Sequence, residues 1–215
     1  MRIGIIGSGN MGKTVGYLLA QKGHEIRLGT QRVTDVKDWV DNERLDVETG
    51  TYQQAVDHAE VLFLTTSWAS THSVITSLKN LSKKILVDCT NPEDPEADHE
   101  HVLGFSTSGS EQIARLAPGA RVVKAFNHLY GSMLLKGTDM NGVRASVFLC
   151  GDEAQAKEVV ANLANDLELD PIDVGGLHRA RLLEPMGNLI VRLASLPENN
   201  GADIAFTLLK RNHSA

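Results

Sequence analysis

The chain opens with a glycine-rich turn placed between an apolar run and an amphipathic segment. Residues Arg2–Ile6 are largely apolar, and the turn Gly7-Ser8-Gly9-Asn10-Met11-Gly12 follows at once. Apolar side chains then recur at helical spacing from residue 15 to residue 19. Strand, tight turn and helix in this order predict a dinucleotide-binding unit, because the amides exposed at such a helix start hold a diphosphate.

Each glycine of the turn has its own expected role. Gly7 permits the tight turn, Gly9 lets the backbone approach a diphosphate, and Gly12 lets the helix pack against the strand. The alternative is an ordinary loop punctuated by glycines. The strand and helix patterns on either side of the turn favour the nucleotide role.

Strand-like and helix-like runs alternate along the rest of the chain. Expected strands cover residues 2–6, 24–29, 45–47, 60–65, 83–88, 121–125, 145–150 and 203–209. Expected helices cover residues 10–22, 34–39 with Thr34 as N-cap, 52–58, 111–116, 152–167 and 180–196, and another buries Val74, Ile75 and Leu78. The alternation predicts an α/β fold with a Rossmann-type, doubly wound and mainly parallel sheet. We expect a dinucleotide-binding domain at residues 1–150 and a C-terminal helix-strand extension at residues 151–215 that completes the sheet and the cleft for a second ligand.

Composition excludes several classes of function. The 215 residues carry a net charge of −6 and are 42% hydrophobic, which predicts a packed core and offers no basic surface for nucleic acid. No apolar run approaches the roughly 18 residues of a membrane helix, and no signal-peptide pattern is present, so we expect a cytoplasmic protein without a membrane partner. Cys89 and Cys150 each follow an apolar run and are expected to be buried, reduced thiols.

The polar segment from Glu93 to Ser110 is the longest expected loop. It contains His99 and His101, whose side chains could both reach one ion. No third ligand stands at a convincing spacing, so we expect a solvated loop and no metal site.

The end of the second expected strand favours NADP over NAD. NAD-preferring sites place a carboxylate here, whereas this chain has Thr30, Gln31 and Arg32. A hydroxyl, an amide and a guanidinium suit a 2′-phosphate. Asp35 would repel that phosphate, and a solvated surface position for Arg32 is the alternative.

Three further strand ends carry residues suited to ligands at the carboxyl edge of the sheet. They are Thr65-Thr66-Ser67-Trp68, Asn91-Pro92 and Ala125-Phe126-Asn127-His128. Small hydroxyl residues leave room for a nicotinamide ribose, and Asn91 offers both a donor and an acceptor. Structural alternatives stay open: Trp68 packing a helix, Asn91 shaping a turn, and His128 capping a helix or lying on the surface.

No arrangement typical of nucleophilic or acid–base catalysis is present. The sequence lacks a Ser-His-Asp order, HExxH and CxxC, and no general acid or base stands out. Hydride transfer between two bound carriers depends on alignment more than on proton chemistry, so no catalytic side chain is expected.

Together these pieces resemble the NADPH-dependent F420 reductase family (F420H2:NADP oxidoreductases), whose relatives include the oxidoreductase domain of the STEAP metalloreductases. The resemblance covers nearly the whole chain. Its matching segments are Ile3–Gly12, Gly23–Glu25, Leu64–Trp68, Asn91-Pro92, Val122–Asn127, Cys150–Asp152, Asp173–Leu177, Arg181–Glu184 and Asn200-Gly201.

The resemblance implies a cofactor site along the carboxyl edge of the sheet. It places the NADP diphosphate on Ser8, Gly9, Asn10 and Met11. It places the 2′-phosphate at Thr30, Gln31 and Arg32, although Gln31 and Asp35 stand where family members often carry basic residues. It lines the nicotinamide side with Thr66, Ser67, Trp68 and Ala125, and lays the deazaflavin against Asn91, Pro92, Phe126 and Asn127.

The resemblance also implies an activity. We expect an NADP-dependent oxidoreductase that passes a hydride between NADPH and a small-molecule acceptor, either F420 or a flavin-like compound. The alternatives are an NADP-binding sensor without turnover and an imine reductase of the pyrroline-5-carboxylate reductase type. The helix Arg181–Leu196 is expected to contribute to a homodimer, with packing inside the monomer as the rival interpretation.

Overall fold

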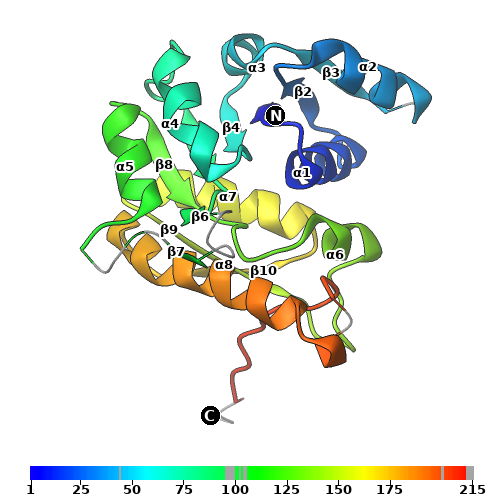
Figure 1. Cartoon of the computed structure of the whole chain (residues 1–215), viewed down its shortest axis with the longest axis vertical. Helices are drawn as coiled ribbons and strands as arrows, with labels where there is room; N and C mark the ends of the chain where they lie inside the picture. The colour runs from blue at the N-terminus through cyan, green and yellow to red at the C-terminus, as the bar shows by residue number, and fades with distance from the viewer. Residues whose placement is uncertain (44, 95–99, 102, 104–105, 200, 212–215) are drawn as a thin grey trace.

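Eight strands form one sheet in the order β10-β9-β8-β5-β4-β1-β2-β3, and helices cover both of its faces (Figure 1). The computed structural model describes residues 1–43, 45–94, 100–101, 103, 106–199 and 201–211. Neighbouring strands are parallel except β8 and β9, which are antiparallel. This arrangement confirms the predicted α/β fold with a mainly parallel, Rossmann-type sheet.

The elements follow the predicted alternation closely. The strands of the sheet are β1 (Arg2–Ile6), β2 (Glu25–Gly29), β3 (Val47–Gly50), β4 (Val61–Leu64), β5 (Ile85–Asp88), β8 (Arg121–Lys124), β9 (Ser146–Gly151) and β10 (Asp170–Asp173). The α-helices are α1 (Asn10–Gln21), α2 (Val33–Asn42), α3 (Tyr52–His58), α4 (Trp68–Ser77), α5 (Gly109–Leu116), α6 (Gly131–Lys136), α7 (Ala154–Asp166) and α8 (Ala180–Ala194). Two 3₁₀ turns, Leu177–Arg179 and Pro197–Asn199, flank α8.

The central strands are buried on both faces, which explains their continuous apolar sequence. All four residues of β4 are fully buried. Phe63 packs in one core cluster with side chains of α1, α2, α6 and α7, whereas its neighbours Leu62 and Leu64 pack in a second cluster with side chains of α3, α4 and α5. Successive side chains of a strand point to opposite faces, so the sheet lies between two helical layers.

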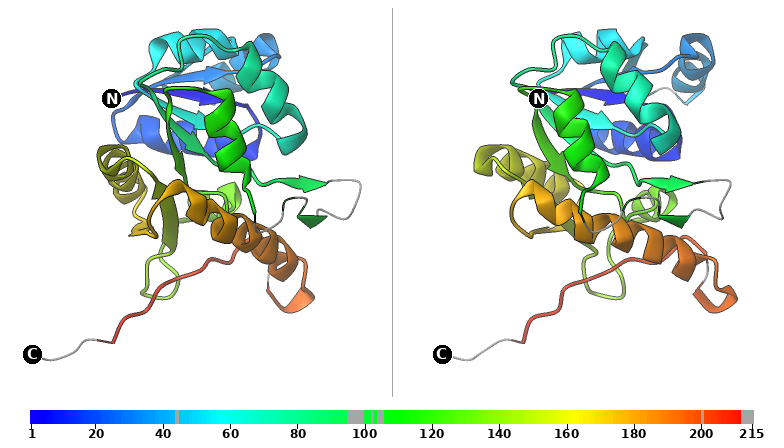
Figure 2. Two further views of the ribbon diagram at one scale, coloured as in Figure 1. Left: turned by 90° about the vertical axis from the view of Figure 1, so that its left-hand side faces the viewer. Right: turned by 60° about the vertical axis from the view of Figure 1, so that its left-hand side comes forward.

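The C-terminal segment differs from the prediction, because no strand forms at residues 203–209. The segment is extended and runs away from the body of the protein (Figure 2). The amide of Ser146 donates to the carbonyl of Phe206 over 2.9 Å, and the Thr207 hydroxyl donates to the carbonyl of Arg144. These contacts fix the segment against the start of β9 at a few points without building a strand ladder. Phe206 packs beside the ring of His128, whereas Leu208 is exposed.

Three local predictions also need correction. The helix expected at 34–39 begins at Val33, so Arg32 and not Thr34 occupies the N-cap. The strand expected at 45–47 lies at Val47–Gly50. Helix α6 was not predicted at all, because its six residues are too short to display a helical period.

The predicted loop at Glu93–Ser110 contains a short hairpin and the start of α5. The hairpin pairs β6 (Glu93–Asp94) with β7 (Glu100–His101), while His99 lies outside the described residues. Among the described residues, no group of three His, Cys, Asp or Glu could hold a metal ion. Within the same part of the chain, every helix is too short or too polar to cross a bilayer.

His128 lies in the core and not at the surface. Its Nδ1 lies 3.4 Å from Asn127 Oδ1, its Nε2 lies 3.3 Å from the carbonyl oxygen of Ser146, and its ring packs beside Phe148 and Phe206. Burial lowers the pKa of His128 to about 4. The neutral imidazole is therefore the form that the fold accommodates.

Acidification is expected to destabilise the protein through His128. As the pH falls below the ordinary imidazole pKa near 6.5, His128 takes up a proton in the unfolded chain. In the folded protein the same side chain stays neutral until the pH approaches its lowered pKa of about 4. The free energy of unfolding should therefore drop across this window by up to about 3 kcal/mol from this group alone. Urea unfolding as a function of pH should show a shallower loss for His128→Gln, while the exposed control His72→Gln keeps the parent profile. Identical profiles for His128→Gln and the parent would contradict this assignment.

Candidate cofactor site

The glycine turn between β1 and α1 is compressed against the end of β4. Gly7 has φ +122°, and a methyl group added there would lie 2.8 Å from the backbone of Thr65. The Thr65 hydroxyl donates to the carbonyl of Gly7 over 3.0 Å. A methyl group on Gly12 would overlap the same carbonyl, so the turn and the helix meet only because both residues lack a side chain.

Gly9 is different, because its α-carbon faces open space. A methyl group added there would meet no protein atom within 4 Å. The space in front of this residue is what a diphosphate would need in order to approach the backbone.

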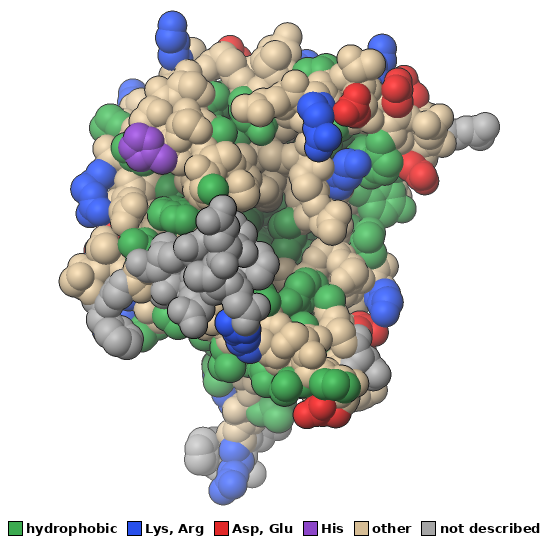
Figure 3. All heavy atoms as spheres, viewed as in Figure 1, with side chains coloured by type: hydrophobic (Ala, Val, Ile, Leu, Met, Phe, Trp, Pro, Cys, Tyr) green, Lys and Arg blue, Asp and Glu red, His purple; other side chains and the backbone are tan. Residues whose placement is uncertain are grey.

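The turn opens into a cavity of about 290 Å³, which we call the nucleotide cavity. It joins the carboxyl ends of β1, β2 and β4, and the face of the molecule seen in Figure 1 is hollowed in its middle (Figure 3). Its lining residues are Gly7, Ser8, Gly9, Thr30, Gln31, Arg32, Tyr52, Thr65, Thr66, Ser67 and Ser70. Among the residues that the structure describes, no carboxylate lines the cavity and Arg32 is the single charged side chain in its lining, so the cavity suits an anionic ligand.

Hydroxyl groups fix the part of the cavity predicted to take the 2′-phosphate. Ser8 Oγ and Thr30 Oγ1 lie 2.8 Å apart, and the amide of Arg32 donates to Thr30 Oγ1 over 3.1 Å. Thr30 is buried, and so it ties the glycine turn to the turn after β2. The guanidinium of Arg32 is 81% exposed and lies 4.0 Å from Asp35, an exposed pair that constrains it weakly.

Tyr52 and Ser70 line the cavity but were not predicted. Tyr52 begins α3 directly after β3, and Ser70 lies in the first turn of α4, three residues beyond Ser67. The position of Tyr52 after a strand that neighbours β2 was the signal that could have revealed it.

Several predicted residues lie outside this cavity. Asn10 faces a separate groove along α1, Met11 packs partly buried on the core, and Trp68 packs against Gly109 at the start of α5. On the acceptor side, Ala125 and Phe126 are fully buried, and Pro92 is buried too. The structure thus brings together the residues of the first, second and fourth strand ends, and leaves those of β5 and β8 as a separate group.

The asparagines of that group bind each other and α8. Asn127 Nδ2 donates to Asn91 Oδ1 over 2.9 Å and to the carbonyl of Leu183 over 2.7 Å, and Asn91 Nδ2 donates to the carbonyl of Asn127 over 2.8 Å. A methyl group on Gly187 would overlap Asn91 Oδ1, so α8 approaches this pair closely. The preceding residue, Phe126, holds a left-handed φ of 63° although it is a buried aromatic residue. The asparagine pair therefore fixes α8 at the edge of the sheet where β5 and β8 end.

A buried ionic cluster lies beside the asparagine pair and was not predicted. Lys124 Nζ lies 3.0 Å from Asp88 Oδ2 and 3.6 Å from Glu184 Oε1, and all three side chains are fully buried. Burial opposes the charged form of Lys124, but the two carboxylates outweigh it and raise its pKa. Burial raises the pKa of Glu184, with Lys124 acting in the opposite direction.

Backbone and hydroxyl donors satisfy the rest of the ionic cluster. The carboxylate of Glu184 accepts the amides of Gly109 and Ser110, the first two residues of α5. Asp88 accepts the hydroxyls of Thr90 and Ser110, and Lys124 donates to the carbonyl of Thr90. The hydrogen bonds and ion pairs of the cluster thus connect β5, β8, α5 and α8, and they can form only when these four elements pack together.

The fold and the nucleotide cavity define the class of the protein, a Rossmann-type dinucleotide-binding protein. The family model for the coenzyme F420-dependent NADP oxidoreductases matches residues 2–92. A solved structure described as a putative F420-dependent NADP reductase from Arthrobacter sp. FB24 is 30% identical, with a TM-score of 0.85 over 98% of this chain and 100% of its own. The chain belongs to the F420-dependent NADP reductase family, as its sequence motifs predicted.

Two curated relatives extend the comparison. The F420-dependent NADP reductase of Methanothermobacter marburgensis is 28% identical over 97% of this chain and 99% of its own length. Metalloreductase STEAP3 of Rattus norvegicus is 30% identical over 85% of this chain but only 36% of its own length. The chain therefore spans about a third of this metalloreductase and the full length of the reductase.

Removing the Glu184 carboxylate is expected to destabilise the fold strongly. Glu184→Ala leaves Lys124 with one buried carboxylate and removes the acceptor for two α5 amides, so the free energy of unfolding should fall by about 3–5 kcal/mol. Urea unfolding measures this loss. Glu158→Ala, at an exposed position of α7, is the matched control and should change stability by less than about 0.5 kcal/mol. A similar, small loss for both variants would show that the ionic cluster does not stabilise this edge of the sheet.

Proposed function

We propose that this protein transfers a hydride between NADP(H) and F420. The observation that carries the proposal is the nucleotide cavity, which joins an open glycine backbone to hydroxyl groups and one guanidinium without any carboxylate. The acceptor is inferred from the relatives described as F420-dependent NADP reductases that match along their full length. In the reaction a hydride passes from NADPH to the deazaflavin ring, and water supplies the one proton that balances it.

Each part of NADP(H) is assigned to the end of a different strand. We assign the diphosphate to the amides of Ser8, Gly9, Asn10, Met11 and Gly12 at the turn that Gly7 allows. We assign the 2′-phosphate to Thr30, Gln31 and Arg32, and the nicotinamide half to Thr65, Thr66 and Ser67. These groups bind and orient NADP(H), and none of them needs to exchange a proton with the reacting atoms.

The acceptor site lies, in this proposal, over the ends of β5 and β8. Asn91, Pro92 and Asn127 would border the deazaflavin, with Trp68 at the side. Ala125 and Phe126 have no exposed surface, so their proposed contribution is to support the floor of the site. The asparagine pair and the buried ionic cluster hold this floor in place against α8.

We further propose that residues 151–215 form a C-terminal extension to the dinucleotide-binding domain at residues 1–150, and that the extension completes the acceptor cleft. The bond from Asn127 to the carbonyl of Leu183 supports this, because it brings α8 to the end of β8. Exposed Leu182, Leu189 and Leu196 follow at seven-residue intervals on and just after α8 and support a homodimer through this helix. Two free cysteines support a cytoplasmic location.

Acceptor-dependent oxidation of NADPH tests the proposal. Purified protein mixed with NADPH and F420 should lose the absorbance of reduced nicotinamide. The variant Gly9→Ala should retain its fold but bind NADPH at least about tenfold more weakly, because its methyl group would occupy the space through which the diphosphate approaches the backbone. FMN in place of F420 tests the flavin-like alternative. Tight NADPH binding without oxidation by either acceptor would contradict the proposal and favour a sensor.

Arg32 is expected to set the preference for NADP. Arg32→Ala should raise the KM for NADPH about five- to tenfold, because the variant loses one exposed contact with the 2′-phosphate. The KM for NADH, which has no such phosphate, should stay unchanged. Steady-state kinetics with both nucleotides measure the ratio, and Lys37→Ala, an exposed position on α2, is the control. Equal effects on the two nucleotides would remove the assignment of Arg32 to the 2′-phosphate.

A further inference from the structure

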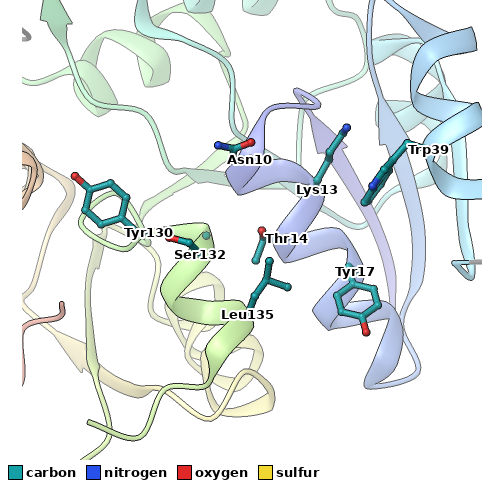
Figure 4. Close-up of a pocket in the computed structure, with 9 residues that line it drawn as sticks. Asn10, Lys13, Thr14, Tyr17, Trp39, Tyr130, Ser132 and Leu135 are labelled. Carbon is teal, nitrogen blue, oxygen red and sulfur yellow. The ribbon is translucent and has the colours of Figure 1, made fainter. Parts of the chain in front are cut away.

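A second cavity, of about 330 Å³, follows the outer face of α1, and we call it the α1 groove (Figure 4). Its floor is the face of α1 that carries Asn10, Lys13 and Tyr17. One wall is Trp39 of α2, and the other is formed by Tyr130 and α6. The nucleotide cavity shares none of these lining residues, so the groove is a separate site.

Two residues that line the α1 groove belong to the segments assigned to the two ligands of the proposed reaction. Asn10 belongs to the glycine turn that is assigned to the diphosphate. Tyr130 follows Asn127, at the end of β8, by three residues. A methyl group on Gly131 would lie 2.8 Å from Thr14 Oγ1, so α6 packs directly on α1 and keeps the groove next to the turn. A ligand seated over the end of β8 therefore has the groove beside it.

The chemistry of the groove suits a flexible anionic chain. Lys13 is its one charged residue, and its ammonium lies 4.6 Å from the centre of the Trp39 ring. Within the part of the chain that is described, Lys13 forms no ion pair, and the side chains of Asn10 and Ser132 form no hydrogen bond. Burial and the nearby Glu93 carboxylate raise the pKa of Tyr130, so the groove carries its positive charge at Lys13 and not on the Tyr130 wall. A cation and unengaged donors beside aromatic walls bind phosphate or carboxylate groups on an extended chain.

We propose that the α1 groove binds the side chain of the deazaflavin acceptor, a chain that carries a phosphodiester and carboxylates. This inference rests on the proposed function, because it assumes that the deazaflavin ring lies over the ends of β5 and β8. Lys13 pairs with an anionic group of the chain, while the aromatic walls cover its carbon atoms. The groove then selects F420 over deazaflavins and flavins that lack the anionic chain.

Binding and kinetics with two deazaflavins test this inference. The probes are F420 and the same ring with only its ribityl chain, and their fluorescence reports binding to protein saturated with NADP⁺, without any need for turnover. Lys13→Gln should raise the Kd and the KM for F420 about five- to tenfold, leave kcat unchanged, and leave both constants for the truncated compound unchanged. Lys79→Gln, which removes an exposed lysine remote from the groove, is the matched control and should change neither.

A second pair of variants tests the groove without touching Lys13. Leu135 is 54% exposed on the α6 wall, so its replacement leaves the core intact. Leu135→Glu should weaken F420 binding more than Leu135→Gln, and raised ionic strength should reduce the difference.

Three results would overturn the inference. Equal effects of Lys13→Gln on F420 and on the truncated deazaflavin would show that the groove does not bind the chain, while the proposed function stands. A selective rise in the Kd for NADPH would assign Lys13 to the nucleotide instead. No binding of either deazaflavin to the NADP⁺-saturated protein would overturn both the inference and the proposed acceptor.

Discussion

The close contact between the glycine turn and the end of β4 is the constraint on which the proposed site depends. Gly7 and Gly12 leave no space for a side chain, and the Thr65 hydroxyl bonds to the carbonyl of Gly7. With the turn held down on the sheet, Ser8 and Gly9 line the nucleotide cavity immediately before the start of α1. Of the three glycines in the turn, only Gly9 has open space before it, so this position suits the approach of a ligand whereas the other two are needed for packing.

The other half of the carboxyl edge is organised by charges that are buried and paired. Lys124 bridges Asp88 and Glu184, and Glu184 in turn caps α5. A buried cation with two carboxylates tolerates little displacement, because any shift leaves a charge unpaired in the core. The asparagine pair adds a hydrogen-bonded contact with α8. Hydride transfer requires a protein to hold two rings in a fixed relative position. This edge of the sheet is rigid enough to support such a position, and the transfer needs no side chain that donates or accepts a proton.

Short-range patterns made much of the fold predictable from the sequence. The first strand, turn and helix are adjacent in the chain, and α3 was placed correctly. In the structure Thr51 and Gln54 form a capping box at its start, a local signal for the beginning of a helix. The ionic cluster could not be predicted, because Lys124 and Glu184 are far apart in the sequence and each looks like a single polar residue in an apolar context. The burial of Phe126 likewise depends on Phe63, from a different strand. A strand was also expected at residues 203–209, but strand pairing depends on a free neighbouring edge that the sequence does not reveal.

Direct transfer between two aligned rings is the central claim of this account, and isotope labelling tests it most directly. NADPH carrying deuterium at the transferred position of C4 is incubated with F420 and the protein in ordinary water, and the reduced deazaflavin is analysed by mass spectrometry. The account predicts one deuterium on the acceptor carbon. Reduced acceptor that carries only protium from the solvent would contradict it.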